Sequence, residues 1–116
     1  MTQPLTTLEE RAQLLANGAA RAADQTFDPL PVVRLFTPDA HAIWLLAALD
    51  PADGDTAWGL IDLGIGMPAL GTVKLSELAG IVGPQQRPIL RDRYFHAARP
   101  LSEYAQLAQR DGSIPD

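Results

Sequence analysis

The residues with the greatest capacity for chemistry are three aspartates, Asp50, Asp53 and Asp55, which surround Gly54. Carboxylates so close together suggest a cation site, because calcium loops take ligands from alternating positions. Their order does not match the D-x-D-x-D-G pattern, however, and no glutamate follows at the distal position. The absence of cysteine also excludes thiolate sites. We therefore predict no metal and no cofactor, and interpret the stretch as a hairpin loop.

Two histidines, His41 and His96, are the natural candidates for a general base. They lie far apart in the sequence, and neither has a serine or acid near it in a nucleophile arrangement. We predict no catalytic residue and no enzyme. The alternative is a small enzyme built around Asp62 and one histidine, which requires a pocket that holds Asp62 with His41 or His96.

Glycines at positions 64, 66 and 71 suggest an anion-binding loop, because backbone amides can contact a phosphate where no Cβ intrudes. Their spacing fails the dinucleotide fingerprint, and no G-K-[ST] follows. We interpret Gly64, Gly66, Pro68 and Gly71 as a structural connection between strands, with Asp62 accepting hydrogen bonds from the amides of the loop.

Four arginines and two aromatic residues form the one basic cluster, which consists of Arg87, Arg91, Arg93, Arg99, Tyr94 and Phe95. Such a cluster could contact nucleic acid. Because Asp92 interrupts it and the chain is acidic overall, we expect these arginines to pair with the aspartate-rich middle of the chain. A nucleic-acid-binding accessory remains the second functional hypothesis.

The net charge of −5 comes from the middle of the chain. Residues 24–73 hold one arginine, Arg34, against seven aspartates: Asp24, Asp28, Asp39, Asp50, Asp53, Asp55 and Asp62. This imbalance disfavours direct binding of nucleic acid and favours a protein partner with a basic surface. The candidate partner-binding residues are Asp39, Asp50, Asp53, Asp55 and Trp58. The alternative is that these aspartates are solvated turn residues.

The N-terminal elements must position these residues. Thr6 and Glu9 predict a capping box at the start of a helix, and the Asn17-Gly18 pair favours a break inside it. A first strand is expected over 32–36, at a sheet edge because two prolines precede it. The apolar run 42–49 predicts a central strand, with Ile43, Leu45, Ala47 and Leu49 on one face.

The second half predicts shorter elements. The segment 57–63 is expected to pair with the central strand as a hairpin, and a third strand is expected over 72–75 after the glycine loop. Ser76 is interpreted as the cap of a short helix that stops at Gly80, and Ser102 as the cap of a helix over 103–110 that Gly112 ends. Between them, 89–95 could form a further strand.

Together these elements predict one α+β domain: a small antiparallel sheet of three to five strands, with an N-terminal and a short C-terminal helix. We assign 1–26 to the N-terminal helical region, 27–112 to the sheet and last helix, and 113–116 to a loose tail. No secretory signal or membrane helix is recognisable, so we expect a cytoplasmic protein. Exposure of Trp44, Leu46 and Trp58 away from the helices would imply a partner or a homodimer.

Four stretches carry a family resemblance: FTPDAHAIWLLAALDP, WGLIDLGIGMPALGTVKLSEL, ILRDRYF and PLSEY. They resemble an uncharacterised bacterial domain-of-unknown-function family, whose members look like accessory proteins of plasmids and integrative conjugative elements. The resemblance covers about Asp28 to Tyr104, and its specific part is D-L-G-x-G-x-P-x-L-G-x-V-x-L-S-E-L. Where related proteins often have an acid in W-L-L-x-E-L-D-P, this chain has Ala48.

The resemblance implies a setting more than an activity, because small acidic proteins of mobile elements commonly act on host defence. It suggests a stoichiometric inhibitor of anti-CRISPR type that binds a CRISPR effector or restriction complex through basic grooves of the complex. Replacing the loop aspartates should then weaken the salt-sensitive part of binding.

Overall fold

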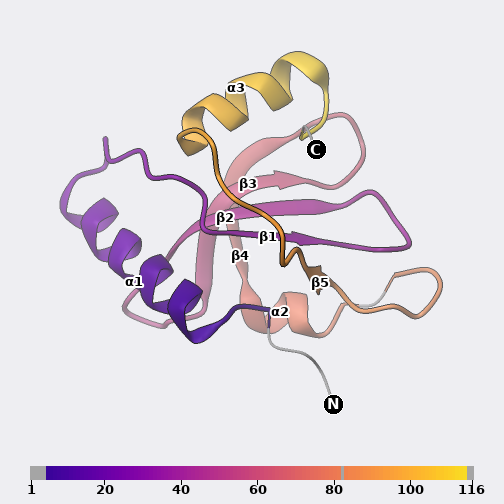
Figure 1. Ribbon diagram of the computed structural model, residues 1–116, viewed down its shortest axis with the longest axis horizontal. Helices are drawn as coiled ribbons and strands as arrows, with labels where there is room; N and C mark the ends of the chain where they lie inside the picture. The colour runs from indigo at the N-terminus through magenta and orange to yellow at the C-terminus, as the bar shows by residue number, and fades with distance from the viewer. Residues whose placement is uncertain (1–4, 82, 115–116) are drawn as a thin grey trace.

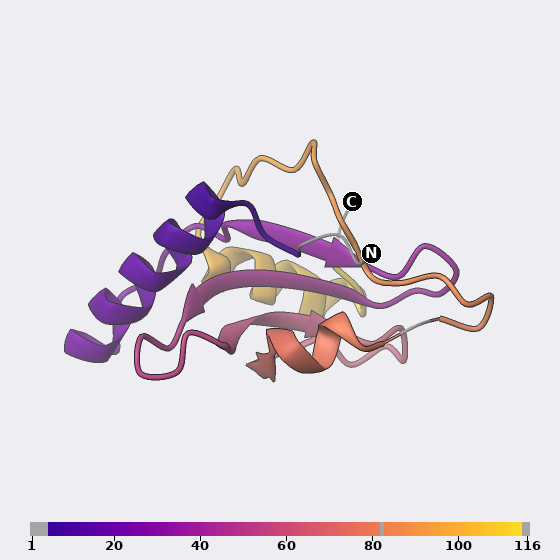
Figure 2. The same cartoon turned by 90° about the horizontal axis from the view of Figure 1, so that it is seen from below.

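The computed structural model describes residues 5–81 and 83–114. Helices and strands follow the order α1 (Leu8–Ala23), β1 (Val33–Phe36), β2 (Ile43–Leu49), β3 (Thr56–Asp62), β4 (Ala69–Lys74), α2 (Leu75–Ala79), β5 (Leu90–Arg91) and α3 (Leu101–Asp111). Figure 1 shows α1 and α3 on different sides of the strands, and Figure 2 shows the strong twist of the sheet between them. The α+β class is confirmed.

All five strands form one antiparallel sheet in the order β4-β3-β2-β1-β5. The central place of β2 and its hairpin with β3 are as predicted. The edge position predicted for the first strand is wrong, because β5 pairs with β1 through Leu35 and Phe36. This pairing is short: the strand expected over 89–95 is reduced to two residues, since the chain turns at Asp92, whose carboxylate accepts the amide of Tyr94.

Alternation along β2 builds two hydrophobic cores, one on each face of the sheet. Trp44 and Leu46 pack with Leu14 of α1, whereas Leu45 and Ala47 pack with Leu101 of α3. Leu14, Leu45, Leu46 and Leu101 are at most 1% exposed. Because the sheet is covered on both faces, its central strand is apolar throughout, as the unbroken run of the sequence requires.

A β-bulge between Leu46 and Ala48 explains the Asn17-Gly18 pair. The Asn17 side chain donates to the Ala47 carbonyl at 2.9 Å, and Gly18 lets α1 approach so closely that a Cβ would lie 1.7 Å from the Leu49 oxygen. The predicted break is therefore wrong, because the pair is a contact point in a continuous helix. The bulge also moves Leu49 to the α1 face, away from its predicted partners.

Helix caps differ from their predicted positions. Thr7 and Glu10, one residue after the predicted pair, form the reciprocal capping box of α1. Neither Ser76 nor Ser102 is an N-cap, since α2 begins after Lys74 and α3 after Pro100. Each serine instead gives its amide and hydroxyl to a distant carboxylate. Gly80 and Gly112 do end their helices, the latter with φ of 80°.

The last corrections concern β4 and the chain end. Strand β4 begins at Ala69, so Gly71 lies inside it, paired with Gly59, and does not belong to the loop. Leu75, expected to end this strand, begins α2. The tail is not loose at residues 113–114, because Ile114 is 4% exposed and its amide is bound. The rest of the predicted tail, 115–116, lies outside the described residues.

Candidate functional site

The four candidate aspartates lie at opposite ends of β2. Asp39 is in the β1–β2 turn, and Asp50, Asp53 and Asp55 are in the β2–β3 loop. The seven residues of β2 place these connections about 20 Å apart, at the usual rise of about 3.3 Å per residue. The structure therefore brings three of these carboxylates together and separates Asp39 from them.

Asp39 holds a neighbouring loop. Its Oδ2 accepts the Gln85 amide at 2.7 Å, and its carboxylate lies so close to Gly83 that a Cβ there would overlap it. Asp39 thus connects the β1–β2 turn to the loop that precedes β5.

The β2–β3 loop is built from carboxylate hydrogen bonds. Asp50 accepts the Ala52 amide, and Asp53 accepts the amides of Asp55 and Thr56. The Thr56 hydroxyl, with help from these amides, lowers the pKa of Asp53 to about 2. The loop is therefore fixed in shape and its carboxylate stays charged at neutral pH.

Asp55 joins this loop to α2. It accepts both the amide and the hydroxyl of Ser76, at 2.9 and 2.6 Å. The Ser76 hydroxyl, followed by its amide, lowers the pKa of Asp55. Asp55 thus supplies the hydrogen bonds that a side-chain cap would give α2, and keeps its charge at the surface.

Trp58 is partly buried on the α3 face of the sheet, and the Arg21 guanidinium lies 4.0 Å from its ring centroid. Trp44 and Leu46 face α1 instead. The three residues therefore do not form one exposed patch, which removes the reason that the sequence offered for a homodimer.

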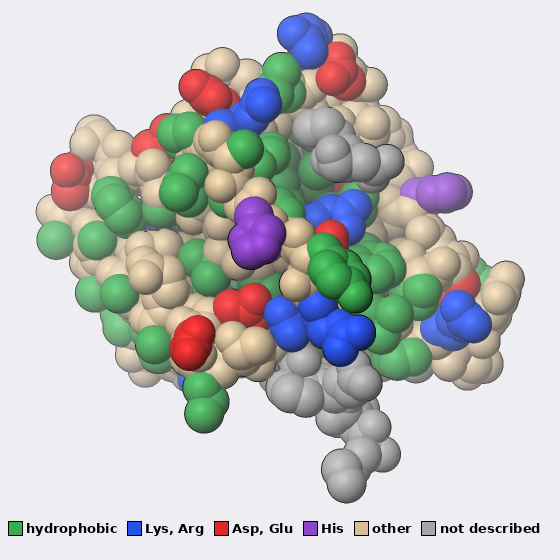
Figure 3. Space-filling view, viewed as in Figure 1, with side chains coloured by type: hydrophobic (Ala, Val, Ile, Leu, Met, Phe, Trp, Pro, Cys, Tyr) green, Lys and Arg blue, Asp and Glu red, His purple; other side chains and the backbone are tan. Residues whose placement is uncertain are grey.

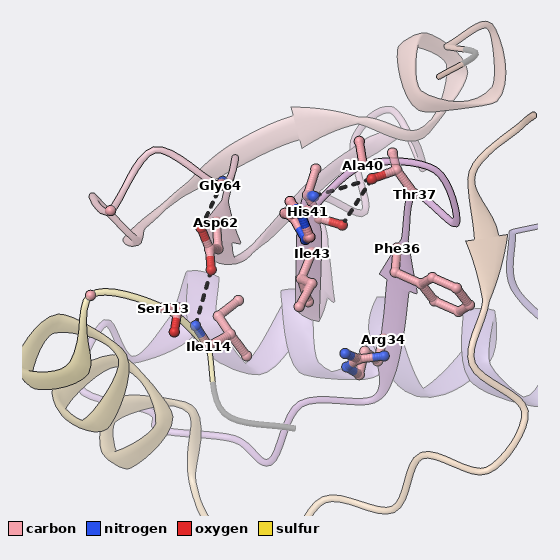
Figure 4. Close-up of a pocket in the computed structure, with 13 residues that line it drawn as sticks. Arg34, Phe36, Thr37, Ala40, His41, Ile43, Asp62, Gly64, Ser113 and Ile114 are labelled. Carbon is pink, nitrogen blue, oxygen red and sulfur yellow. Dashed lines mark hydrogen bonds between the residues drawn. The ribbon is translucent and has the colours of Figure 1, made fainter. Parts of the chain in front are cut away.

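Asp62 holds the β3–β4 loop, as Figure 4 shows. It is 2% exposed, and its Oδ1 accepts the Gly64 amide at 2.9 Å while its Oδ2 accepts the Ile114 amide at 3.0 Å. Gly64 and Gly66 both adopt φ of 80°, a backbone conformation that residues other than glycine rarely adopt. The loop is therefore shaped by two glycines and tied by one buried carboxylate to Ile114, in the segment that follows α3.

This loop and the start of β4 expose four large apolar side chains. Leu63, Ile65, Met67 and Leu70 are 58, 70, 75 and 44% exposed. We call them the apolar loop. Sequence reasoning missed this cluster, although apolar residues alternating with turn-forming glycines were the available signal. Because large exposed apolar patches are uncommon in monomers, these side chains are the candidate binding surface of the chain.

The apolar loop adjoins an open sheet edge. Among the described strands, β4 pairs with β3 alone, so its outer backbone groups face away from the sheet. At the other end of β4, Lys74 pairs with Thr56 and leads to α2, which Asp55 holds. The β4 edge therefore has apolar side chains at its beginning and, at its end, the β2–β3 loop with Asp50, Asp53 and Asp55, which we call the acidic loop.

A cavity of about 410 Å³ lies behind the apolar loop and contains both His41 and Asp62. This is the pocket that the enzyme alternative requires. The backbone amides of Gly64 and Ile114 already occupy both Asp62 oxygens, so this carboxylate serves the loop.

Among the described residues, no three His, Asp or Glu side chains are grouped as metal ligands. None of the helices described here is long and apolar enough to cross a membrane.

Two of the four arginines predicted to pair with the acidic middle have other contacts. Arg91 pairs with Glu10 of α1 at 3.2 Å, and the Arg99 guanidinium lies 5.7 Å from the Tyr104 ring centroid. Arg87 and Arg93 are exposed. The prediction fails because the segment after β5 runs beside α1 and α3, whereas the acidic loop lies at the far end of β2.

Comparison with known proteins gives one match. The model of the family described as "Protein of unknown function (DUF2958)" matches residues 5–115. No curated protein and no solved structure matches the chain.

Proposed function

The chain belongs to the DUF2958 family of proteins of unknown function, and from this starting point we propose that it acts by binding another protein on the β4 edge. The observation that carries this proposal is the apolar loop beside an open edge strand. Exposed, flat edges favour aggregation, and proteins usually protect them with charges, prolines or covering segments. Here one lysine at the end of β4 is the sole charge in the strand, which suits an edge that is meant to be paired.

An extended segment of the partner is the occupant that fits this edge. Such a segment would add a sixth strand, its backbone pairing with β4 and its apolar side chains contacting the apolar loop. Burying a large apolar side chain contributes about 1.5–3 kcal/mol. Leu63, Ile65 and Met67 could therefore supply much of the binding free energy.

The charge of the edge selects the partner. Asp50, Asp53 and Asp55 lie together in the β2–β3 loop at the end of β4, and the Arg11 guanidinium lies against Gly54 of the same loop. A strand with basic residues beyond its apolar part would match this edge. A second copy of the chain matches it poorly, because antiparallel pairing of two β4 strands would set each acidic loop against an apolar loop.

The resemblance to accessory proteins of mobile elements makes a host defence complex the partner class that we propose. In this role the protein is a stoichiometric inhibitor of anti-CRISPR type, which binds a CRISPR effector or restriction complex at a basic surface. The net charge of −5 supports such a target, since opposite charges accelerate association at low salt.

The test is to measure binding of immobilised protein to purified defence complexes at low and high salt, beside protection of phage or plasmid in cells. The double variant Ile65→Asp and Met67→Asp should abolish binding and protection. The matched control is Leu8→Asp, which makes the same change at a residue 87% exposed on α1. Equal binding by the double variant, or no binding and no protection with any complex, would refute the proposal.

A further inference from the structure

A second cavity, of about 520 Å³, lies on the α3 face of the sheet, between α3 and the segment 92–99. Leu45 and Leu107 form its apolar floor, and Phe95 and Tyr104 are among its walls. Figure 3 views the molecule from this side and shows basic and histidine side chains beside apolar ones below α3. The cavity therefore combines an apolar interior with a polar rim.

Among the described residues that line this cavity, two arginines face one carboxylate. Arg34 and Arg99 line it together with Asp92, whose Oδ2 accepts a hydrogen bond from Arg34 at 3.2 Å. No carboxylate within the described ranges lies at ion-pair distance from Arg99. Its guanidinium instead lies near the Tyr104 ring. Arg99 can thus offer its donors to an anion that enters the cavity.

Aromatic rings complete the rim. Tyr94 is 83% exposed although it lines the cavity, and the hydroxyl of Tyr104 accepts the Ala98 amide at 3.0 Å. The second contact fixes segment 92–99 against α3, so the wall that carries Phe95 is already in place. An exposed ring at the entrance of an apolar cavity is a platform on which a planar ligand can stack.

The anion must be held by side chains, because the start of α3 has no amides to spare. The Leu101 amide donates to the Pro29 carbonyl, and the Ser102 amide donates to the Asp28 carboxylate. The amides of Glu103 and Tyr104 both donate to the Pro100 carbonyl. The side-chain nitrogen donors among the described lining residues belong to Arg34, Arg99 and His96.

We propose that this cavity binds a nucleoside phosphate, with the base between Tyr94 and the apolar walls and the phosphate at Arg99. The volume lies in the range of small-molecule sites, about 300–1,000 Å³. The net charge of the chain does not forbid this ligand, since salt screens charges beyond about 10 Å at 0.1 M and the local rim is cationic. The ligand could be a free nucleotide or one unit of a single strand.

Isothermal titration with AMP and fluorescence anisotropy with a labelled ten-nucleotide single strand, both at about 0.1 M salt, test the proposal and distinguish these two sources. We expect Arg99→Gln to weaken binding at least tenfold and Tyr94→Ala to weaken it about 5- to 100-fold, the usual effect of removing a stacking ring. Arg93→Gln is the matched control, because this exposed arginine does not line the cavity.

Binding of AMP alone identifies a free nucleotide, and tighter, more salt-sensitive binding of the strand identifies nucleic acid. The proposal is overturned if neither probe binds, or if Arg99→Gln and Arg93→Gln have equal affinity. It is also overturned if ribose 5-phosphate binds as well as AMP, because the base would then contribute nothing. None of these results depends on whether a protein docks at β4.

Discussion

Replacing Asp62 by asparagine should strongly destabilise the fold. The variant keeps the shape of the side chain but removes its charge, and it places an amide N–H where the carboxylate accepts a backbone donor. Gly64 and Ile114 supply the two donors, at 2.9 and 3.0 Å, in a site that is 2% exposed. Hydrogen bonds to charged groups contribute about 1.5–3 kcal/mol each, and a buried donor left unpaired costs about 1–3 kcal/mol.

These values predict a loss of about 2–4 kcal/mol in the free energy of unfolding, because asparagine can still accept one of the two bonds. For a chain of this length each kcal/mol lowers Tm by about 3–6 °C. Urea denaturation measures the free energy, and hydrogen exchange at Gly64 and Ile114 shows whether the loss is local. Asp111→Asn, the same change at a half-exposed carboxylate, is the control and should leave the midpoint unchanged.

A loss below about 1 kcal/mol, or unchanged exchange at both amides, would show that water or another donor network replaces the Asp62 contacts. The role assigned to Asp62 as the clamp of the loop would then be wrong.

Three further predictions concern the contacts of α1, the acidic loop and α2. Gly18→Ala should cost more than about 2 kcal/mol despite the better helix propensity of alanine, because its Cβ would overlap the backbone of Leu49. Gly80→Ala, which has room, is the control for the same urea experiment. Because the pKa of Asp53 falls from 3.8 to about 2 on folding, its contribution is full above about pH 4 and disappears as pH falls towards 2. Thermal melts at each pH should show that Tm falls less between about pH 4 and pH 2 for Asp53→Asn than for the unsubstituted protein, because the variant lacks this titrating carboxylate. Finally, Asp55→Ala should speed hydrogen exchange at the start of α2, and equal rates would contradict the capping role.

The sequence predicts the centre of the fold better than its edges. The run 42–49 has turn residues on both sides and was correctly assigned as the central strand, because its apolar pattern reflects burial on both faces. The capping box was misplaced because Thr6-Thr7 is followed by Glu9-Glu10, so two boxes one residue apart satisfy the same pattern. Choosing between them requires tertiary contacts.

The serine caps failed for a different reason. Ser76 and Ser102 look like local N-caps, but each donates its amide and hydroxyl to Asp55 or Asp28, which lie 21 and 74 residues away in sequence. A carboxylate is a stronger acceptor than a hydroxyl, so it replaces the local cap wherever the fold brings it near. No spacing rule can reveal such a pair.

The candidate site was only partly predictable for the same physical reason. The hydrogen bond from Gly64 to Asp62 was expected, since it is a local contact between residues two positions apart. The exposure of Ile65 and Met67 could not be expected from the sequence, because it depends on β4 lying at the sheet edge. Likewise, Arg34 joins Arg99 at one cavity only through the pairing of β1 with β2 and the position of α3.

The hydrogen bonds that Gly64 and Ile114 donate to Asp62 suggest that this carboxylate affects partner binding without touching the partner. Two glycines at φ of 80° would leave the apolar loop mobile on their own, and fixing a mobile loop at the moment of binding reduces affinity. The carboxylate removes this cost by ordering the loop in advance. If the variant Asp62→Asn must spend about 1 kcal/mol to order the loop, its partner affinity should fall about fivefold while the protein is still folded. Binding measured well below the Tm of the variant tests this step, and an unchanged Kd would show that the loop orders itself without Asp62.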